Sequence, residues 1–314
     1  MRKTAAQAND ACQDGLVIAS HGRHVLVETP QGQEVICHAR GKKSQTVVGD
    51  RVRWLPSQDE GTIESVLPRR NLLYRQDEVR TKSFAANLDQ VLILIAAEPE
   101  FSESQLTRAL LAAQAAGIEP LIALNKSDLH APFERAWVKL APYRAMGYQV
   151  LSLALKPRDG LTPLPSDDVM AVLDHKTTLI LGPSGSGKST LINRLIPQAQ
   201  VLTGEISTAL NSGKHTTTST RWYWLNHEKH TALIDSPGFQ EFGLQHLDPM
   251  HLATLMPDFK PWIAGCRFYN CTHLHEPGCG VRAQVESGDQ PGRISAHRYK
   301  LYSDLFAELS QTRY

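Results

Sequence analysis

Long apolar runs, net charge and clustered charge of one sign are all scarce in this sequence of 314 residues. The longest uninterrupted apolar run, residues 91–97, has seven residues, whereas a membrane-spanning helix needs about 20. No apolar segment follows the two basic residues at the N-terminus, so no secretory signal is visible. Lys and Arg total 33, Asp and Glu total 32, and apolar residues make up 41%. These values exclude a disordered polyelectrolyte, a collagen-like fibre and a coiled coil. They favour a cytosolic globular protein of two or three domains without a membrane partner.

The net charge of +1 conceals an uneven distribution. Residues 1–85 carry 13 basic and 10 acidic side chains, residues 86–259 carry 13 and 17, and residues 260–314 carry 7 and 5. The two ends are therefore mildly basic and the middle is acidic, although chance alone can produce differences this small.

Short apolar runs separated by turn signals occupy residues 15–85. Strands at this spacing, with Gly and Pro between them, predict a small β-barrel. About 70 residues suit a five-stranded OB-type barrel, a fold that commonly binds oligonucleotides. Basic side chains supply positive charge there: Arg40, Lys42, Lys43, Arg51 and Arg53. A barrel with solvated surface lysines and arginines is the simpler alternative. Residues 1–85 are the expected first domain, and nucleic acid is one candidate ligand for it.

The period of the apolar pattern changes after residue 88. Four apolar runs have the pattern of buried parallel strands: 91–95, 120–124, 149–153 and 177–181. Helical patterns alternate with them, including residues 131–146. This alternation predicts an α/β domain with a largely parallel sheet over residues 86–247. The pattern is helical again over residues 248–314, the expected third domain.

A phosphate-binding motif follows the strand expected at 177–181. Residues 182–189 read Gly-Pro-Ser-Gly-Ser-Gly-Lys-Ser and match G-x-x-x-x-G-K-[ST], with a helical pattern after them. We expect Lys188 to contact the β- and γ-phosphates and Ser189 to ligate Mg²⁺. The expected nucleotide contacts of this segment are Gly182, Pro183, Ser184, Gly185, Ser186, Gly187, Lys188, Ser189 and Thr190. A chance glycine-rich turn is the alternative, which the preceding strand and following helix disfavour.

The segment Asn125-Lys-Ser-Asp128 matches the N-K-x-D motif of GTPases. The Asp128 carboxylate can accept hydrogen bonds from guanine N1–H and the 2-amino group, and adenine lacks the exocyclic donor. Asn125 can bond guanine N7 and bridge to the phosphate loop, while the stem of Lys126 covers the base. A turn with helix caps is the alternative for this motif alone. Ser152 falls where a second base-contacting loop is expected, although Leu153 stands where alanine is usual.

Two further segments fit the nucleotide-sensing switches of GTPases. Asp235-Ser-Pro-Gly238 fits D-x-x-G, so we expect Asp235 to hold Mg²⁺ through water and the Gly238 N–H to sense the γ-phosphate. Of three adjacent threonines at residues 216–218, we favour Thr217 as the Mg²⁺ ligand of the GTP state. Phe239 stands where many GTPases have the glutamine that orients the attacking water, so slow intrinsic hydrolysis is expected.

The order of these motifs is unusual. In a conventional GTPase the phosphate loop comes first, but here N-K-x-D lies 57 residues before it. The sequence therefore predicts a circularly permuted GTPase domain, in which both switch segments lead into the C-terminal region.

Four metal-ligating side chains are grouped near the C-terminus: Cys266, Cys271, His273 and Cys279. In a reducing cytosol such a group favours metal binding over disulfide formation. Three thiolates and one imidazole suit a tetrahedral structural Zn²⁺ site, which would stabilise a segment too small to bury a core of its own. His275 is an alternative ligand, and buried unligated cysteines are the alternative to a metal site.

Together these residues resemble the RsgA/YjeQ family of GTPases that depend on the small ribosomal subunit. The resemblance covers nearly the whole chain. It rests on Val-Gly-Asp-Arg-Val at 48–52, N-K-x-D, the phosphate loop, His-Thr-Thr-Thr at 215–218, Asp-Ser-Pro-Gly at 235–238 and the Cys₃His cluster, in that order. It implies an OB-type barrel, a permuted P-loop GTPase domain and a helical zinc-binding domain.

The same resemblance implies an activity and a partner. The protein would hydrolyse GTP to GDP, stimulated by the small ribosomal subunit, whose rRNA it would contact late in maturation. In the family, the histidine of a Phe-Gly-Leu-x-His pattern is implicated in catalysis, and here that residue is His246. From the sequence alone it is one of 13 histidines and more typical of a surface or packing residue. We expect a monomer. A nucleotide-regulated RNA-binding scaffold and an ATP-using kinase or ATPase are the alternatives, and N-K-x-D argues against the second.

Overall fold

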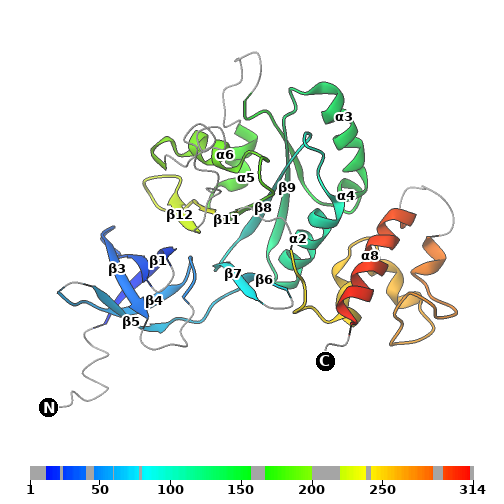
Figure 1. Ribbon diagram of the computed structural model, residues 1–314, viewed down its shortest axis with the longest axis horizontal. Coiled ribbons are helices and arrows are strands. Elements are labelled where there is room, and N and C mark those ends of the chain that lie inside the picture. Colours follow the sequence, from blue (N-terminus) through cyan, green and yellow to red (C-terminus); the bar gives the residue numbers. More distant parts are fainter. Residues whose placement is uncertain are drawn as a thin grey trace.

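The computed structural model describes residues 12–21, 24–39, 46–58, 60–77, 80–156, 167–199, 220–237, 242–285 and 293–311. Figure 1 shows a small barrel near the N-terminus, a central sheet flanked by helices, and a separate helical region that contains the C-terminus. These three parts follow one another along the chain in the predicted order.

Five strands form the barrel: β1 (Gln13–His21), β2 (His24–Glu28), β3 (Glu34–Ala39), β4 (Arg51–Leu55) and β5 (Gly61–Val66). Strand β1 pairs with β2 and β4, and β3 and β5 complete the ring, so the predicted five-stranded barrel is confirmed. Its interior holds Val17, Val25, Val27, Cys37, Val52, Trp54 and Ile63.

The apolar run at residues 46–48 is not a strand, because Asp50 closes a turn there. Its N–H donates to Val47 O over 3.1 Å and its carboxylate accepts from Val47 N over 2.8 Å.

A hairpin that the sequence analysis did not identify follows the barrel. Its strands are β6 (Leu72–Gln76) and β7 (Thr81–Ala86). A distant segment extends it, because Gln76 N donates to Gly243 O over 3.1 Å and Gln245 N donates to Gln76 O over 3.0 Å. The rings of Phe84 and Phe242 stack with centroids 5.6 Å apart. Residues 242–244 therefore lie along the hairpin, with one bridge between Gln76 and Leu244, and residues 245–246 form a turn beside it.

Six strands form the central sheet: β8 (Gln90–Ala96), β9 (Glu119–Asn125), β10 (Val150–Leu153), β11 (Thr177–Leu181), β12 (Arg221–Trp224) and β13 (Ala232–Asp235). Their order is β10-β9-β8-β11-β13-β12, with every pairing parallel except that of β12 with β13. The phosphate-loop strand β11 thus lies in the middle, between β8 and β13. The predicted parallel α/β sheet is confirmed.

Helices cover both faces of this sheet: α2 (Glu103–Ala115), α3 (His130–Lys139), α4 (Ala141–Ala145), α5 (Asp167–Leu173) and α6 (Lys188–Leu195). Side chains of β8 alternate between the faces. Val91, Ile93 and Ile95 join the core shared with α2 to α4, and Leu92 and Leu94 join the core shared with α5 and α6. The helix expected over 131–146 is two helices that meet at Leu140, with a proline in the first turn of the second. Proline lacks the N–H that a continuous helix would need there.

The barrel is joined to the sheet edge to edge. Ala19 of β1 pairs with Arg221 of β12, so barrel and sheet strands form one hydrogen-bonded array. Glu28 of the barrel accepts a 2.8 Å hydrogen bond from Trp224 Nε1 and forms an ion pair with Lys229. Strand β12, which follows the switch threonines in the chain, is thereby held directly against the barrel.

The C-terminal region has short 3₁₀ helices and one long α-helix: η2 (Pro249–Leu255), η3 (Lys260–Gly265), η4 (Arg282–Gln284) and α8 (Ala296–Leu309). The short 3₁₀ helix η1 (Pro197–Ala199) follows α6 in the central domain. Within the described ranges, no helix is both long and apolar enough to cross a bilayer.

Candidate nucleotide and metal sites

The phosphate motif forms the loop between β11 and α6. Gly187 adopts φ +108°, a left-handed conformation that side chains other than glycine rarely adopt. A Cβ atom at Gly187 would also lie 2.5 Å from Asn125 Nδ2. The loop therefore requires glycine at this position, and it lies directly against the N-K-x-D segment.

Lys188 begins α6 and its side chain folds back over the loop. Its ammonium group donates to Gly182 O over 2.8 Å and to Pro183 O over 3.0 Å. Burial lowers the pKa of Lys188 to about 8, and the nearby Asp235 carboxylate partly opposes that shift. Asp235 ends β13 and is 1% exposed, and the adjacent Ser236 hydroxyl donates to Ile180 O over 2.7 Å. A cation and a carboxylate thus lie together at the carboxyl ends of two neighbouring parallel strands, where open α/β sheets bind ligands.

Asn125 connects the two nucleotide motifs. This side chain is 4% exposed, and its Nδ2 donates to Ser186 O of the phosphate loop over 2.9 Å. Its Oδ1 accepts from Lys126 N over 2.8 Å and from Leu155 N over 3.1 Å. The bridge to the phosphate loop that the sequence analysis expected is present.

The rest of the N-K-x-D segment is held by backbone contacts. Lys126 has φ +71°, and its ammonium group donates to Glu98 O. Ser127 N donates to Leu153 O over 3.0 Å, and Asp128 is half-buried. Ser152 is exposed on β10. The backbone of residues 153 and 155 therefore contacts the N-K-x-D segment. Backbone contacts do not depend on side-chain identity, so the sequence pattern around Ser152 could not reveal them.

The other residues expected to contact the nucleotide lie in the phosphate loop and in the first turn of α6. Ser184 and Gly185 are exposed, Gly182 and Ser186 are buried, and Pro183, Ser189 and Thr190 are half-buried. Thr217, Gly238 and Phe239 lie outside the described residues.

His246 is docked on the β6–β7 hairpin. Its ring lies against Tyr74 with centroids 4.3 Å apart. Burial lowers the pKa of His246, and its buried Nδ1 has no hydrogen-bond partner within the described ranges. A Cβ at Gly243 would lie 2.4 Å from Gln76 O, so close approach to the hairpin depends on this glycine. Tyr74 was missed by the sequence analysis, because a contact across 172 residues leaves no local pattern.

The four C-terminal metal-ligating side chains converge. Their donor atoms all lie within 4.8 Å of one another. His273 Nδ1 is 3.5 Å from Cys266 Sγ and 3.4 Å from Cys279 Sγ. Burial raises the pKa of the Cys271 thiol to about 12 in the absence of a cation. Three thiols and an imidazole at these separations fit a tetrahedral zinc ion. His275 is exposed and lies outside the cluster, so the geometry favours His273 of the two alternatives.

The loop that carries these ligands is braced from behind. Glu276 accepts from Thr272 N over 2.8 Å, from the Thr272 hydroxyl over 2.6 Å and from His275 N over 3.2 Å. Burial raises the pKa of Glu276, but these hydrogen bonds outweigh it and lower the pKa to about 2. The Tyr299 hydroxyl of α8 donates to His273 O over 2.7 Å. The ligand loop is thus positioned by groups that surround the predicted ion.

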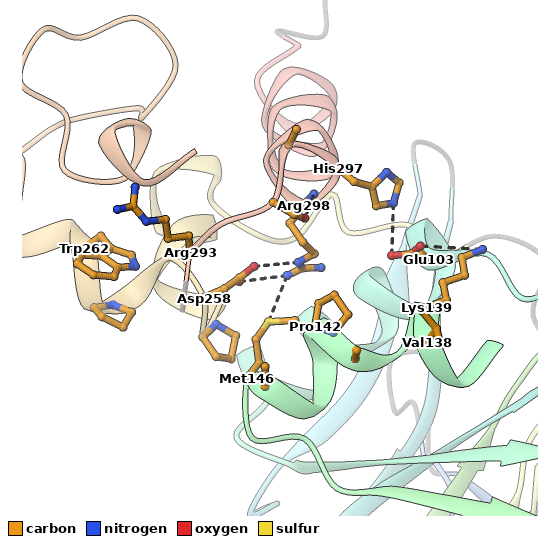
Figure 2. A pocket seen from close by; sticks show the side chains of 16 residues that line it. Glu103, Val138, Lys139, Pro142, Met146, Asp258, Trp262, Arg293, His297 and Arg298 are labelled. Carbon is orange, nitrogen blue, oxygen red and sulfur yellow. Dashed lines mark hydrogen bonds and ion pairs between the residues drawn. The ribbon is translucent and has the colours of Figure 1, made fainter. Parts of the chain in front are cut away.

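Helix α8 also connects the C-terminal region to the central domain. Arg298 is 4% exposed; it pairs with Asp258, with Nε–Oδ2 at 2.9 Å, and donates to the Thr107 hydroxyl of α2 over 2.9 Å. Figure 2 shows this guanidinium between Asp258 and Met146, beside a cavity of about 1010 Å³. His297 contacts Glu103 of α2 on the far side of Arg298. Helix α8 therefore contacts α2 through Arg298 and His297, and contacts the cysteine loop through Tyr299.

Comparisons with known proteins agree with this geometry. Residues 66–245 match the family model described as RsgA GTPase. The chain belongs to the RsgA GTPase family. It is 68% identical over 312 residues to the small ribosomal subunit biogenesis GTPase RsgA of Variovorax paradoxus (strain S110), covering 99% of this chain and 97% of that protein. It is 52% identical to the protein of the same name from Paraburkholderia phymatum, covering 98% and 96% of the two chains. Because RsgA GTPases are GTP hydrolases, the predicted enzyme class is confirmed.

Solved structures show the same architecture. YjeQ from Thermotoga maritima has a TM-score of 0.71 at 28% identity, covering 96% of this chain and 100% of that one. YloQ, described as a circularly permuted GTPase, has a TM-score of 0.69 at 26% identity, and both chains are covered completely. The predicted resemblance and the predicted circular permutation are confirmed.

Proposed function

We propose that this protein hydrolyses GTP during maturation of the small ribosomal subunit, which stimulates the reaction. The supporting observation is end-to-end similarity to proteins named small ribosomal subunit biogenesis GTPases, combined with a guanine motif bonded to the phosphate loop by Asn125. We further propose three functional units, residues 1–85, 86–247 and 248–314. The first two units are in direct contact, because the hairpin at 72–86 packs against α2 and bonds to residues 243–245.

The phosphate chain would lie along the loop at residues 182–187. The Lys188 ammonium group donates to two loop carbonyl oxygens in this structure. With GTP bound, it would donate to oxygens of the β- and γ-phosphates in their place. We assign Mg²⁺ to Ser189, Thr217 and Asp235, with Gly238 beside the γ-phosphate. Bound there, Mg²⁺ would neutralise charge that develops on the phosphates.

Guanine would be held by the N-K-x-D segment. Asp128 would accept from the base N1–H and 2-amino group, Lys126 would cover the ring, and Asn125 would position both loops. Ser152 is the proposed fourth base contact.

His246 is the proposed group that assists attack by water. Its contact with Tyr74 supports a resting state in which the imidazole packs on the hairpin and is held away from the nucleotide. In this docked position burial lowers the pKa of His246, which favours the neutral imidazole, the form whose lone pair can accept a proton. Subunit binding would move residues 242–246 from the hairpin and deliver this ring to the phosphates.

The other two units would contact rRNA. The barrel pairs with β12. Helix α8 contacts the cysteine loop through Tyr299 and contacts α2 through Arg298, so both units are in contact with the nucleotide domain. We propose that Cys266, Cys271, His273 and Cys279 hold one structural Zn²⁺, and that the protein acts as a monomer in the bacterial cytoplasm, where its substrate particle is assembled.

The decisive experiment is GTP turnover titrated with purified small subunits at several salt concentrations. Turnover should rise steeply with subunit and fall with salt, because phosphate contacts are lost as salt increases. Asp128→Asn should shift preference from GTP toward xanthosine triphosphate, and Lys188→Ala should lose nucleotide affinity. Subunit binding without any rise in turnover would instead support a nucleotide-regulated scaffold.

A further inference from the structure

Three segments of the chain meet at the side chain of Arg108, which lies on α2. Its Nη1 donates to Phe242 O over 3.4 Å and to Glu308 Oε1 over 3.0 Å, and its Nη2 donates to Glu308 Oε2. Glu308 is in the last turn of α8, and Phe242 lies four residues after Gly238 of the D-x-x-G motif. One guanidinium group therefore connects α2, the C-terminal helix and the backbone of the segment that leads to His246.

The ion pair between Arg108 and Glu308 has a bidentate geometry. Both carboxylate oxygens accept from the guanidinium, and such a pair holds its two side chains in one relative orientation. These side chains are 19% and 35% exposed, whereas those of the Lys300–Asp304 pair on the same helix are 72% and 61% exposed, so solvent screens the first pair less. Glu308 thus fixes where Arg108 points, and Arg108 presents a donor to Phe242 O.

Helix α8 is placed for this contact by its other end. Arg298, in the first turn of α8, pairs with Asp258 and donates to the hydroxyl of Thr107, the residue before Arg108 on α2. Ten residues separate Arg298 from Glu308, which is about 15 Å along a helix. Helix α8 is therefore attached to α2 near both of its ends, and the position of Glu308 depends on the docking of the whole helix.

The backbone after Phe242 makes the contacts that dock His246 on the hairpin. Gln76 N donates to Gly243 O over 3.1 Å, and Gln245 N donates to Gln76 O over 3.0 Å. The Phe242 carbonyl belongs to the peptide group that begins Gly243. A donor that fixes this carbonyl oxygen therefore restrains the backbone where the docked contact starts.

We propose that Arg108 is a positioning residue for the segment that carries His246, and that Glu308 holds Arg108 in place. This role rests on the proposed function of His246 in water attack. In the resting state Arg108 keeps the segment docked on the hairpin. Loss of the Glu308 contact frees the guanidinium, weakens its bond to Phe242 O and increases the population in which His246 leaves the hairpin. The C-terminal domain thereby regulates the docking of His246 through one ion pair.

The test is amide hydrogen exchange in the free full-length protein, measured at Gln76 and Gln245. Both N–H groups are donors in the docked contact, so their exchange reports the fraction of molecules in which it opens. Arg108→Met keeps a side chain of similar length without a donor, and both amides should exchange about tenfold faster, as expected for loss of a hydrogen bond from a charged group. Glu308→Gln should accelerate exchange by a smaller factor, because Arg108 keeps its donors. The increase should exceed that at the amides of β8, which opens only with the whole domain.

Asp304→Asn is the matched control, because Asp304 is an exposed carboxylate on the same helix. It should leave exchange at Gln76 and Gln245 unchanged. A variant with both Arg108→Met and Glu308→Gln should exchange as Arg108→Met alone does, because Glu308 acts through Arg108. The proposal would be overturned by wild-type exchange at the two amides in Arg108→Met, by an equal increase at β8, or by additive effects in the double variant.

GTP turnover separates this role from the proposed function. If His246 assists water attack, Arg108→Met should raise subunit-free turnover about tenfold with KM for GTP unchanged, since more molecules have the imidazole released. Faster exchange at the two amides without a change in turnover would uphold the positioning role of Arg108 and refute the role of His246 in hydrolysis.

Discussion

Replacement of Asn125 tests whether the bridge between the two nucleotide motifs serves GTP binding. The side chain makes three hydrogen bonds, to Ser186 O, Lys126 N and Leu155 N. At about 1 kcal/mol net for each bond, Asn125→Ala should destabilise the joined loops by about 3 kcal/mol. If binding must re-form this arrangement, GTP affinity should fall by up to about 100-fold, since 1.4 kcal/mol corresponds to about a factor of ten.

Asn125→Asp separates the Nδ2 bond to the phosphate loop from the two bonds that Oδ1 accepts. An aspartate keeps an acceptor for the two amides, but it places a buried carboxylate oxygen against Ser186 O, so the bond to the phosphate loop is replaced by repulsion. We expect GTP to bind this variant about tenfold more weakly.

The matched control is Asn71→Ala. Asn71 also makes backbone hydrogen bonds, 2.8 Å from Nδ2 to Leu88 O and 2.8 Å from Leu88 N to Oδ1, but at the base of the hairpin. It should lower Tm without changing GTP affinity. The assays are titration with a fluorescent GTP analogue and thermal unfolding. An Asn125→Ala protein that loses stability as Asn71→Ala does, yet binds GTP within twofold of wild type, would refute a role for the bridge in binding.

Three further outcomes follow from individual side chains. Burial lowers the pKa of Lys188 to about 8, so above that pH the free protein must take up a proton to bind GTP; Kd should rise about tenfold per pH unit, and a flat profile would contradict this assignment. Tyr269 is fully exposed between Cys266 and Cys271, so Tyr269→Ala should weaken small-subunit binding by about 1–3 kcal/mol in sedimentation assays while subunit-free turnover stays unchanged. Glu28→Gln removes the charge that pairs with Lys229 and should reduce stimulation of turnover by the subunit more than it reduces subunit binding.

Local motifs were the most predictable part of this protein. The phosphate loop, N-K-x-D and the Cys₃His cluster each occupy a short stretch, and their order alone indicated a permuted domain. The apolar runs of β8, β9 and β11 were equally clear, because a strand buried on both faces needs apolar side chains at nearly every position.

Contacts between distant segments were not predictable in the same way. The hairpin at 72–86 has short, mixed strands, and the segment that lies along it comes from residues 242–244. The docking of His246 on Tyr74 depends on that pairing. Likewise, the choice of His273 over His275 depended on the turn that buries one imidazole and exposes the other.

The sequence by itself determined the nucleotide chemistry and the domain order, because glycine-rich loops, guanine-specific carboxylates and thiolate ligands act through residue type and short spacing. Tertiary structure alone decided what joins the domains: Glu28 against Trp224, Arg298 between Asp258 and Thr107, and Arg108 between Phe242 and Glu308. Each of these contacts links residues that are tens to hundreds of positions apart. They arise because the chain packs as a whole, and no periodicity within a segment encodes them.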